Sequence, residues 1–140
     1  QQDLLVILPD DCLNELLSSM HTPVIFRTMM TNKANKERIK KNIQFLNFFQ
    51  ITLSSNTLEK AVSSLPSLTR LNLSDCGLRD LPNDLPNLTA LNVLNISHNR
   101  FNDEDLPSVV SALKNLTSLD ISRCCLRDLP DDLPNLTALK

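Results

Sequence analysis

The stretch LTRLNLSDCGL, residues 68–78, places leucines at offsets 0, 3, 5 and 10 from its first residue. The text that follows from Leu78, LRDLPNDLPNLTALN, returns 48 residues later as LRDLPDDLPNLTALK. Over the larger unit, residues 68–92 and 116–140 are identical at 18 of 25 positions. This duplication indicates that the chain is built from repeated units that can be aligned with one another.

The same spacing of apolar residues defines four repeats. It recurs in LNVLNISHNRF from Leu91, in LTSLDISRCCL from Leu116 and, less regularly, in IQFLNFFQITL from Ile43. The starts at 43, 68, 91 and 116 are 23 or 25 residues apart, within the period of about 20–29 residues typical of leucine-rich repeats. Over about two thirds of its length the chain resembles that family. The resemblance implies a solenoid that gains one strand with each repeat.

Elementary packing explains the spacing. Leu71 and Leu73 alternate with polar residues, as in a strand with one buried face, and such a strand is stable only when stacked on others. Between the strands, Pro82 and Pro86 predict turns or short 3₁₀ segments. Two other connections predict α-helices: LSSNTLEKAVSSL, capped by Ser55 or Asn56, and FNDEDLPSVVSALKNL, whose Leu106, Val109, Val110 and Leu113 have helical spacing. We therefore expect an α/β fold, a right-handed leucine-rich repeat solenoid with a parallel sheet on its concave face and an N-terminal helical cap.

Counted from the first residue of each repeat, the residues at offsets 2 and 4 alternate with the buried ones and therefore face the concave side. We expect the residues at offsets 6 and 7 to lie on the same side. Offset 4 is polar in every repeat and offset 6 is mostly small, whereas offsets 2 and 7 vary in size and charge. The family resemblance implies that such a face binds a protein partner. The candidate contacts are Arg70, Asn72, Asp75, Val93, Asn95, His98, Asp120 and Arg123.

The cysteines fit a structural role better than a chemical one. Cys76 and Cys124 occupy offset 8, where the family places a residue that bonds the backbone of neighbouring turns. We expect both to be buried and too far apart for a disulfide, with Cys125 exposed. The absence of a disulfide framework favours a cytoplasmic or other intracellular compartment, and an extracellular one stays open.

Composition argues against several function classes. The net charge is −2 and the chain holds one glycine, so a glycine-rich phosphate loop is excluded. His98 has neither a nucleophile nor a carboxylate pair beside it, and we expect no enzyme activity, cofactor, metal or small-molecule substrate. The basic run at 33–41 lacks interleaved aromatics, which argues against nucleic acid. No apolar run approaches the ~20 residues that span a bilayer.

Residues 1–42 form a separate segment, because the repeat pattern fades before Ile43. One interpretation is a helical cap that covers the end of the array. The other is an adaptor-binding segment, because LPDDCLNELL resembles the opening of an F-box, although the Cys and Trp usual near the end of that motif are absent. Its candidate adaptor contacts are Leu8, Pro9, Leu13, Leu16 and Leu17. Leu8, Cys12 and Leu16 also fit the loose pattern of elongin-binding boxes.

Three functions follow from these patterns. The first is a protein-interaction scaffold built on residues 43–140. The second is a substrate receptor of a ubiquitin ligase, using residues 1–42 for its adaptor. The third is the ectodomain of a Toll-like or other leucine-rich repeat receptor, which LNISHNRF and LTSLDIS resemble. In that setting five Asn-x-Ser/Thr sites could carry glycans: Asn72, Asn87, Asn95, Asn115 and Asn135. Leu136 and Leu139 match residues that precede an earlier strand, so we expect an array truncated at its C-terminus with an exposed apolar end.

Overall fold

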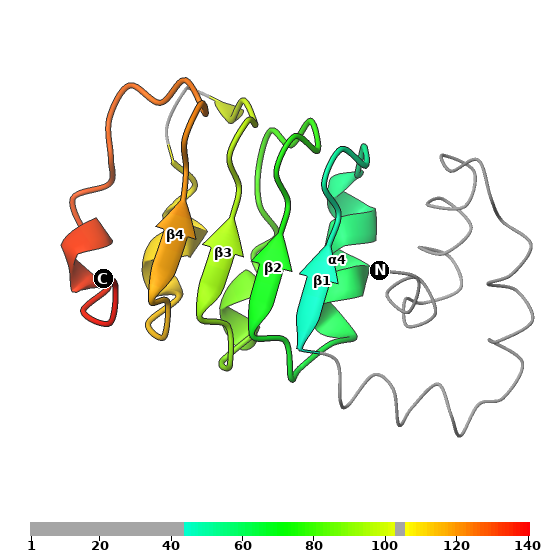
Figure 1. The fold of residues 1–140 in the computed structure, drawn as a ribbon. Coiled ribbons are helices and arrows are strands. Elements are labelled where there is room, and N and C mark those ends of the chain that lie inside the picture. Colours follow the sequence, from blue (N-terminus) through cyan, green and yellow to red (C-terminus); the bar gives the residue numbers. More distant parts are fainter. Residues whose placement is uncertain (1–43, 103–105) are drawn as a thin grey trace, which may run out of the picture.

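The computed structural model describes residues 44–102 and 106–140. Four short strands form one parallel sheet in the order β1-β2-β3-β4, which is also their order along the chain (Figure 1). The strands are β1 (Phe45–Asn47), β2 (Arg70–Asn72), β3 (Val93–Asn95) and β4 (Ser118–Asp120). Each strand lies at the same place in its repeat, as the offset alignment predicts.

The register of the sheet confirms that alignment residue by residue. Leu46 pairs with Leu71, Leu71 with Leu94, and Leu94 with Leu119. The ladder continues past each strand, because the N–H at offset 5 donates to the carbonyl at offset 4 of the next repeat. These bonds measure 2.7 Å from Leu73 to Asn95 and 2.9 Å from Ile96 to Asp120. The same backbone conformation therefore recurs in each repeat, and backbone hydrogen bonds link it to the next repeat.

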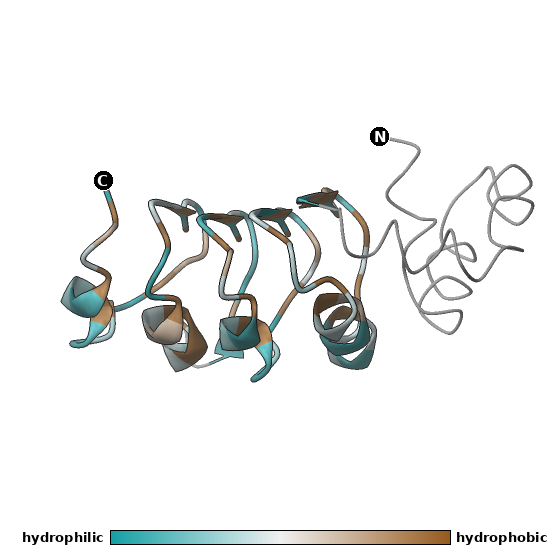
Figure 2. Cartoon of the chain, turned by 90° about the horizontal axis from the view of Figure 1, so that it is seen from below, coloured by the Kyte–Doolittle hydropathy of each residue, from teal (hydrophilic) through white to brown (hydrophobic). Residues whose placement is uncertain are grey.

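A second layer of helical segments covers one face of the sheet (Figure 2). It contains the α-helix α4 (Ser55–Ser63) and the 3₁₀ segments η2 (Leu85–Asn87), η4 (Ser108–Ala112) and η5 (Leu133–Asn135). The core lies between the layers: the apolar side chains at offsets 3, 5 and 10 of the first three repeats are all buried. In the fourth repeat, Leu119, Ile121 and Leu126 are only partly buried, since no described strand lies beyond β4.

The helix α4 forms where it is predicted, but its cap lies one or two residues earlier. Ser54 has an extended backbone (φ −75°, ψ 150°), and its side chain accepts a hydrogen bond from the N–H of Thr57. Ser55 is already the first helical residue, so neither it nor Asn56 is the cap. Leu58, Ala61 and Val62 turn the apolar side of the helix into the core.

The prediction of an α-helix in FNDEDLPSVVSALKNL is wrong for the part of that segment that the structure describes, from residue 106 on. The segment is the 3₁₀ helix η4, in which Val110 donates to Pro107 and Leu113 to Val110, each bond spanning three residues. Two adjacent β-branched valines have low helix propensity, and no side chain caps the start. The predicted inward side is nevertheless correct, because Val110 and Leu113 are buried.

The proline-bent connections are confirmed. Both η2 and η5 are 3₁₀ turns with a proline in their first positions, and Leu85 donates to Pro82 as Leu133 does to Pro130. Proline has no N–H to lose there and its fixed φ suits a tight turn.

Residues 1–43 lie outside the described residues, and with them the predicted helical cap and the adaptor-binding candidates. At the other end Leu136 is buried and Leu139 is 37% exposed. The N–H of Lys140 donates to Thr117, as that of Asn92 does to Thr69 two repeats earlier. Among the helices described, none combines the length and the apolar character that crossing a membrane requires.

Candidate protein-binding face

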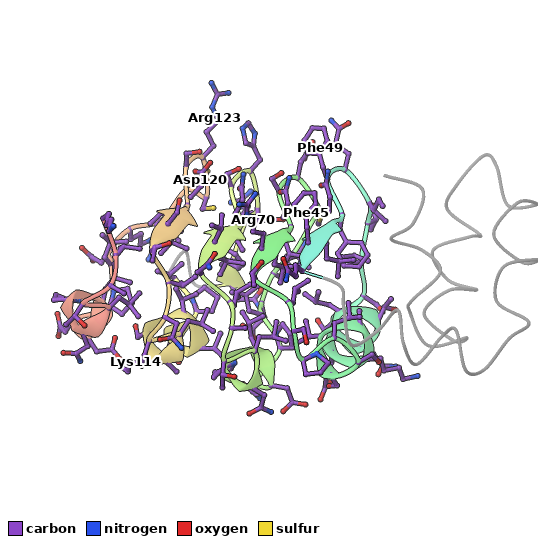
Figure 3. The ribbon with its side chains drawn as sticks, turned by 60° about the horizontal axis from the view of Figure 1, so that its bottom comes forward. Phe45, Phe49, Arg70, Lys114, Asp120 and Arg123 are labelled. Atoms are coloured by element: carbon purple, nitrogen blue, oxygen red, sulfur yellow. The ribbon has the colours of Figure 1, made fainter. Side chains whose placement is uncertain are left out.

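The face of the sheet opposite the helical layer is here called the open face, and it carries offsets 2, 4, 6 and 7 of each repeat. At offset 2, Phe45, Arg70 and Ser118 are exposed and Val93 is half-buried. Phe45 and Arg70 point away from the helical layer, on which Lys114 lies (Figure 3). The two predicted contacts at offset 2, Arg70 and Val93, thus lie side by side on neighbouring strands.

The polar residues at offset 4 hold the turns that follow the strands. The side-chain oxygen of each accepts the N–H two residues later, at 3.0 Å in all four repeats. These are Asx turns, which end a strand by supplying a local acceptor. Asn72, Asn95 and Asp120 therefore lie on the predicted face but have an oxygen engaged in their own backbone. Asn47 does the same in the first repeat.

The charge of Asp120 is stabilised by the same turn. The backbone N–H of Ser122, helped by its hydroxyl and by nearby His98, holds the pKa of Asp120 below its usual range. A depressed carboxyl pKa adds stability that is present at neutral pH and lost as the pH falls through the folded-state pKa.

The small residues at offset 6 are mostly not available for contacts. Ser74 and Ser97 are 5% and 4% exposed, and each hydroxyl donates to the Asx oxygen of its own repeat at 2.7 Å. In the first repeat the same offset holds Phe49, which is 52% exposed. One offset thus serves a turn in the second to fourth repeats and presents an aromatic ring in the first.

Offset 7 has a left-handed backbone in every repeat, which the leucine pattern does not reveal. The φ values are 58° at Gln50, 54° at Asp75, 56° at His98 and 55° at Arg123. The N–H of the first three donates to the offset-6 carbonyl of the next repeat, at 2.9 to 3.2 Å. These bonds fix the turns from which the variable side chains project, and Gln50 also donates to the Asp75 carboxylate at 3.1 Å.

From the second repeat to the fourth, the offset-8 residues form the predicted buried ladder, whereas Ile51 at this offset of the first repeat is partly buried. Asn99 is 3% exposed and accepts the N–H of Cys76 and of Leu78, at 3.2 and 2.9 Å. Its amide donates to three carbonyls, those of Leu73, Ile96 and Ser97. The Cys76 thiol donates to Phe48 at 3.0 Å, and the Cys124 thiol to Ile96 at 3.2 Å. In successive repeats, asparagine and cysteine at offset 8 therefore have the same role: each donates to the offset-5 carbonyl of the preceding repeat.

The thiols divide as expected, with Cys76 and Cys124 buried and Cys125 exposed. Burial raises the pKa of the Cys76 thiol to about 11 and also raises that of Cys124. Because the unfolded thiol ionises nearer 9.0, Cys76 contributes stability that is full below that pH and lost as the pH rises toward 11.

This division predicts selective alkylation. In a Cys12→Ser variant at about pH 8, iodoacetamide should modify Cys125 quickly and leave Cys76 and Cys124 intact until the chain is unfolded, because the thiolate is the reactive form. Mass spectrometry of digested protein measures each rate, and denatured protein is the control. Modification of Cys76 at the rate of Cys125 in folded protein would contradict the ladder assignment.

Two aromatic residues of the open face were missed as candidate contacts. Phe45 and Phe49 are 45% and 52% exposed, although both belong to the first repeat next to buried Leu46 and Phe48. The sequence did contain a signal, because both fall at offsets that the alternation turns outward. Within 44–102 and 106–140, no three His, Cys, Asp or Glu side chains gather closely enough to bind a metal ion.

The comparisons with known proteins agree with this geometry. The Leucine Rich Repeat family model matches residues 67–88, 90–113 and 115–136. Among solved structures, a chain in the crystal structure of the TLR13–ssRNA13 complex is 32% identical with a TM-score of 0.59. The similarity covers 74% of this chain and 15% of that one. No curated protein gives a significant match.

The chain therefore belongs to the leucine-rich repeat family. Its described residues form four successive repeats, three of which the family model matches.

Proposed function

We propose that the chain is a protein-interaction scaffold that binds its partner through the open face. The observation that carries the proposal is the pair of exposed phenylalanines on the first repeat, 45% and 52% exposed at Phe45 and Phe49. Arg70 pairs in register with Phe45 on the neighbouring strand, so an aromatic and a cationic side chain stand side by side.

Such a combination suits recognition of a protein surface. Aromatic residues and arginine dominate the binding energy of protein interfaces, because they bury large areas and hydrogen-bond at low entropic cost. The strand register and the Asx turn at Asn47 fix the backbone beneath Phe45 and Phe49. A preorganised surface loses little entropy on binding.

Leucine-rich repeat proteins are generally scaffolds without catalytic activity, and the proposed function includes no chemical reaction. The partner is a protein, bound without a cofactor. His98, the residue that could act as a general base, instead contributes to the interaction surface from its turn at offset 7.

Affinity capture with single-residue variants tests the proposal. Tagged full chain should retain a reproducible set of proteins from cell extract, and Phe49→Ala and Phe45→Ala should each reduce capture about tenfold or more, the loss expected of an interface hot spot. Leu129→Ala is the matched control, because Leu129 is also 52% exposed but lies outside the open face. Equal capture by all three variants would refute binding through this face.

A second candidate is a fragment of a receptor ectodomain, which the similarity to the TLR13 chain favours. Secreted protein should then carry glycans at Asn87 and Asn135, which are exposed on the helical side. Asn72 and Asn95 are half-buried with an oxygen engaged in Asx turns, so they should stay unmodified. Glycosidase treatment after expression in secreting cells, with Asn87→Gln and Asn135→Gln as controls, measures the sites; no mobility shift would reject this candidate.

Three finer points belong to the same proposal. We take the strand connections to be right-handed, as parallel β crossovers nearly always are, and residues 1–42 to be a helical cap. The free buried thiols at Cys76 and Cys124 favour a reducing, intracellular compartment. A ubiquitin-ligase receptor role would instead require residues 1–42 to bind an adaptor, and deletion of that segment would then abolish adaptor capture while binding at the open face persists.

A further inference from the structure

A pocket of about 370 Å³ opens among the turns that follow β2, β3 and β4. Its floor includes the buried Leu78 and Asn99, and its wall is made of exposed side chains from three successive repeats. The lining residues are Asp75, Gly77, Leu78, Arg79, His98, Asn99, Arg100, Arg123 and Cys125. Its volume lies at the small end of the range of about 300–1,000 Å³ typical of ligand sites.

The lining is unusual in its charge. Arg79, Arg100 and Arg123 are three of the five arginines in the described residues, and none of the lining residues is a lysine. Against these three positive charges stands one aspartate among the described lining residues, which together carry two net positive charges while the whole chain carries −2. The single acid, Asp75, has one oxygen engaged by Gln50 of the first repeat at 3.1 Å. Charge of one sign is therefore concentrated at this place.

The geometry makes this concentration a property of the fold. Asp75, His98 and Arg123 hold the same offset in consecutive repeats, each with a left-handed backbone. Gly77 and Cys125 share offset 9 and are left-handed too, with φ of 67° and 53°. Arg123 projects from its turn above β4, away from the helical layer (Figure 3). Stacked turns thus aim side chains from three repeats into one opening.

We propose that this pocket, the arginine pocket, binds a phosphorylated side chain on a peptide segment of the protein partner. A phosphoryl group carries about −1.5 to −2 charges and three strong acceptor oxygens, which matches a wall with two net positive charges. Arginine presents a planar fork of donors that suits phosphate better than the point charge of lysine. His98 adds an N–H donor whether its imidazole is neutral or protonated.

The pocket favours a phosphopeptide over RNA as the carrier. Proteins that bind single-stranded nucleic acid combine a basic groove that follows the backbone with aromatic platforms for the bases. Here the positive charge is gathered in one pocket, and neither of the exposed phenylalanines of the open face lines it. Instead, the aromatic pair on the first repeat and the arginine pocket on the second to fourth would contact different parts of one protein partner.

A fluorescent peptide with one phosphoserine among neutral residues tests the inference on the full chain. Fluorescence anisotropy should show binding that weakens about tenfold in Arg79→Gln and in Arg123→Gln, the loss expected for one charge-assisted hydrogen bond. The same peptide with unmodified serine should bind at least tenfold more weakly. Lys114→Gln removes one positive charge from the helical layer and should leave the affinity within about twofold.

A gain in affinity excludes damage to the fold as the explanation. Asp75→Asn removes the one acid of the wall and keeps an acceptor for Gln50 at a left-handed position that asparagine tolerates. It should tighten phosphopeptide binding about threefold, as expected when one repelling charge is removed at an exposed site. Unchanged affinity in Asp75→Asn, together with unchanged affinity in both arginine variants, would overturn the assignment.

Cys125 supplies a readout that needs no change to the pocket. In a Cys12→Ser chain, saturating phosphopeptide should slow alkylation of Cys125 about tenfold or more, and inorganic phosphate should do so only at much higher concentration. An RNA oligonucleotide that protects Cys125 where the phosphopeptide does not would overturn the peptide assignment.

The inference rests on the proposed function for the carrier of the phosphate. If capture still depends on Phe49 while no phosphopeptide binds, the arginine pocket assignment fails alone; if the phosphopeptide binds but capture ignores Phe45 and Phe49, the open-face proposal fails alone.

Discussion

Asn99→Ala is expected to lower the free energy of unfolding by about 4 kcal/mol. The amide of Asn99 makes five hydrogen bonds to the backbone, two as acceptor and three as donor. Alanine would leave the buried N–H groups of Cys76 and Leu78 without their acceptor, and each unsatisfied buried group costs about 1–3 kcal/mol. Because a whole domain is stable by only about 5–15 kcal/mol, the loss should be visible directly in a urea denaturation curve.

The matched control for this variant is Asn99→Cys. Cysteine occupies the same offset at Cys76 and Cys124, where its thiol donates to the carbonyl at offset 5 of the preceding repeat. A thiol at position 99 can therefore donate to Leu73, while its sulfur accepts N–H groups only weakly. We expect a cost of about 1–2 kcal/mol, clearly below that of alanine. Equal losses for the two variants would show that a thiol at this position replaces none of the stabilising hydrogen bonds of the asparagine.

Leu94→Ala should cost about 4 kcal/mol, whereas Leu119→Ala should cost about 1–2 kcal/mol. The two leucines have the same offset and pair with each other in register. Leu94 is 1% exposed between β2 and β4, while Leu119 on the last described strand is partly buried. The cost of removing methyl groups rises with the cavity that remains, and a partly open site leaves little cavity.

Parallel urea titrations of the two leucine variants measure the difference, with far-UV circular dichroism as the signal. Ser118→Ala is a control on the exposed face of β4, and it should change the stability by less than about 0.5 kcal/mol. If Leu94→Ala and Leu119→Ala were equally destabilising, the fourth repeat would be packed as tightly as the third, contrary to the burial of Leu119.

The repeat spacing predicted the strands, their register and the inward residues because each depends on local alternation and a fixed period. Leu71 and Leu94 could be paired from their offsets alone, and Cys76 could be placed in the core. The α-helix in FNDEDLPSVVSALKNL was predicted wrongly because apolar spacing alone does not decide between an α-helix and a 3₁₀ helix. The choice between them depended on Val109, Val110 and the missing cap.

The sequence predicted which residues lie on the candidate face, but not which of their side chains are engaged in turns and which are available to a partner. The leucine pattern shows that Asn72 points outward, and it does not show that its oxygen is used by the turn behind it. Likewise the left-handed backbone at His98 is accompanied by a hydrogen bond from its N–H to Ser122 of the next repeat, which no single repeat reveals. The arginine pocket was invisible for the same reason, since Arg79, Arg100 and Arg123 come from three different repeats.

The near-identity of the second and fourth repeats has a consequence for how such a chain can change length. A recombination event that deletes residues 68–115 would join residue 67 directly to Leu116 without breaking the period. The helix α4, which now packs against η2, would meet η5, a segment with the same LPN sequence and the same 3₁₀ turn. Duplication of the same 48 residues would lengthen the array without breaking the period. Unequal crossing-over could therefore change the length of the open face while the packing between neighbouring repeats stays of a kind already present in the core.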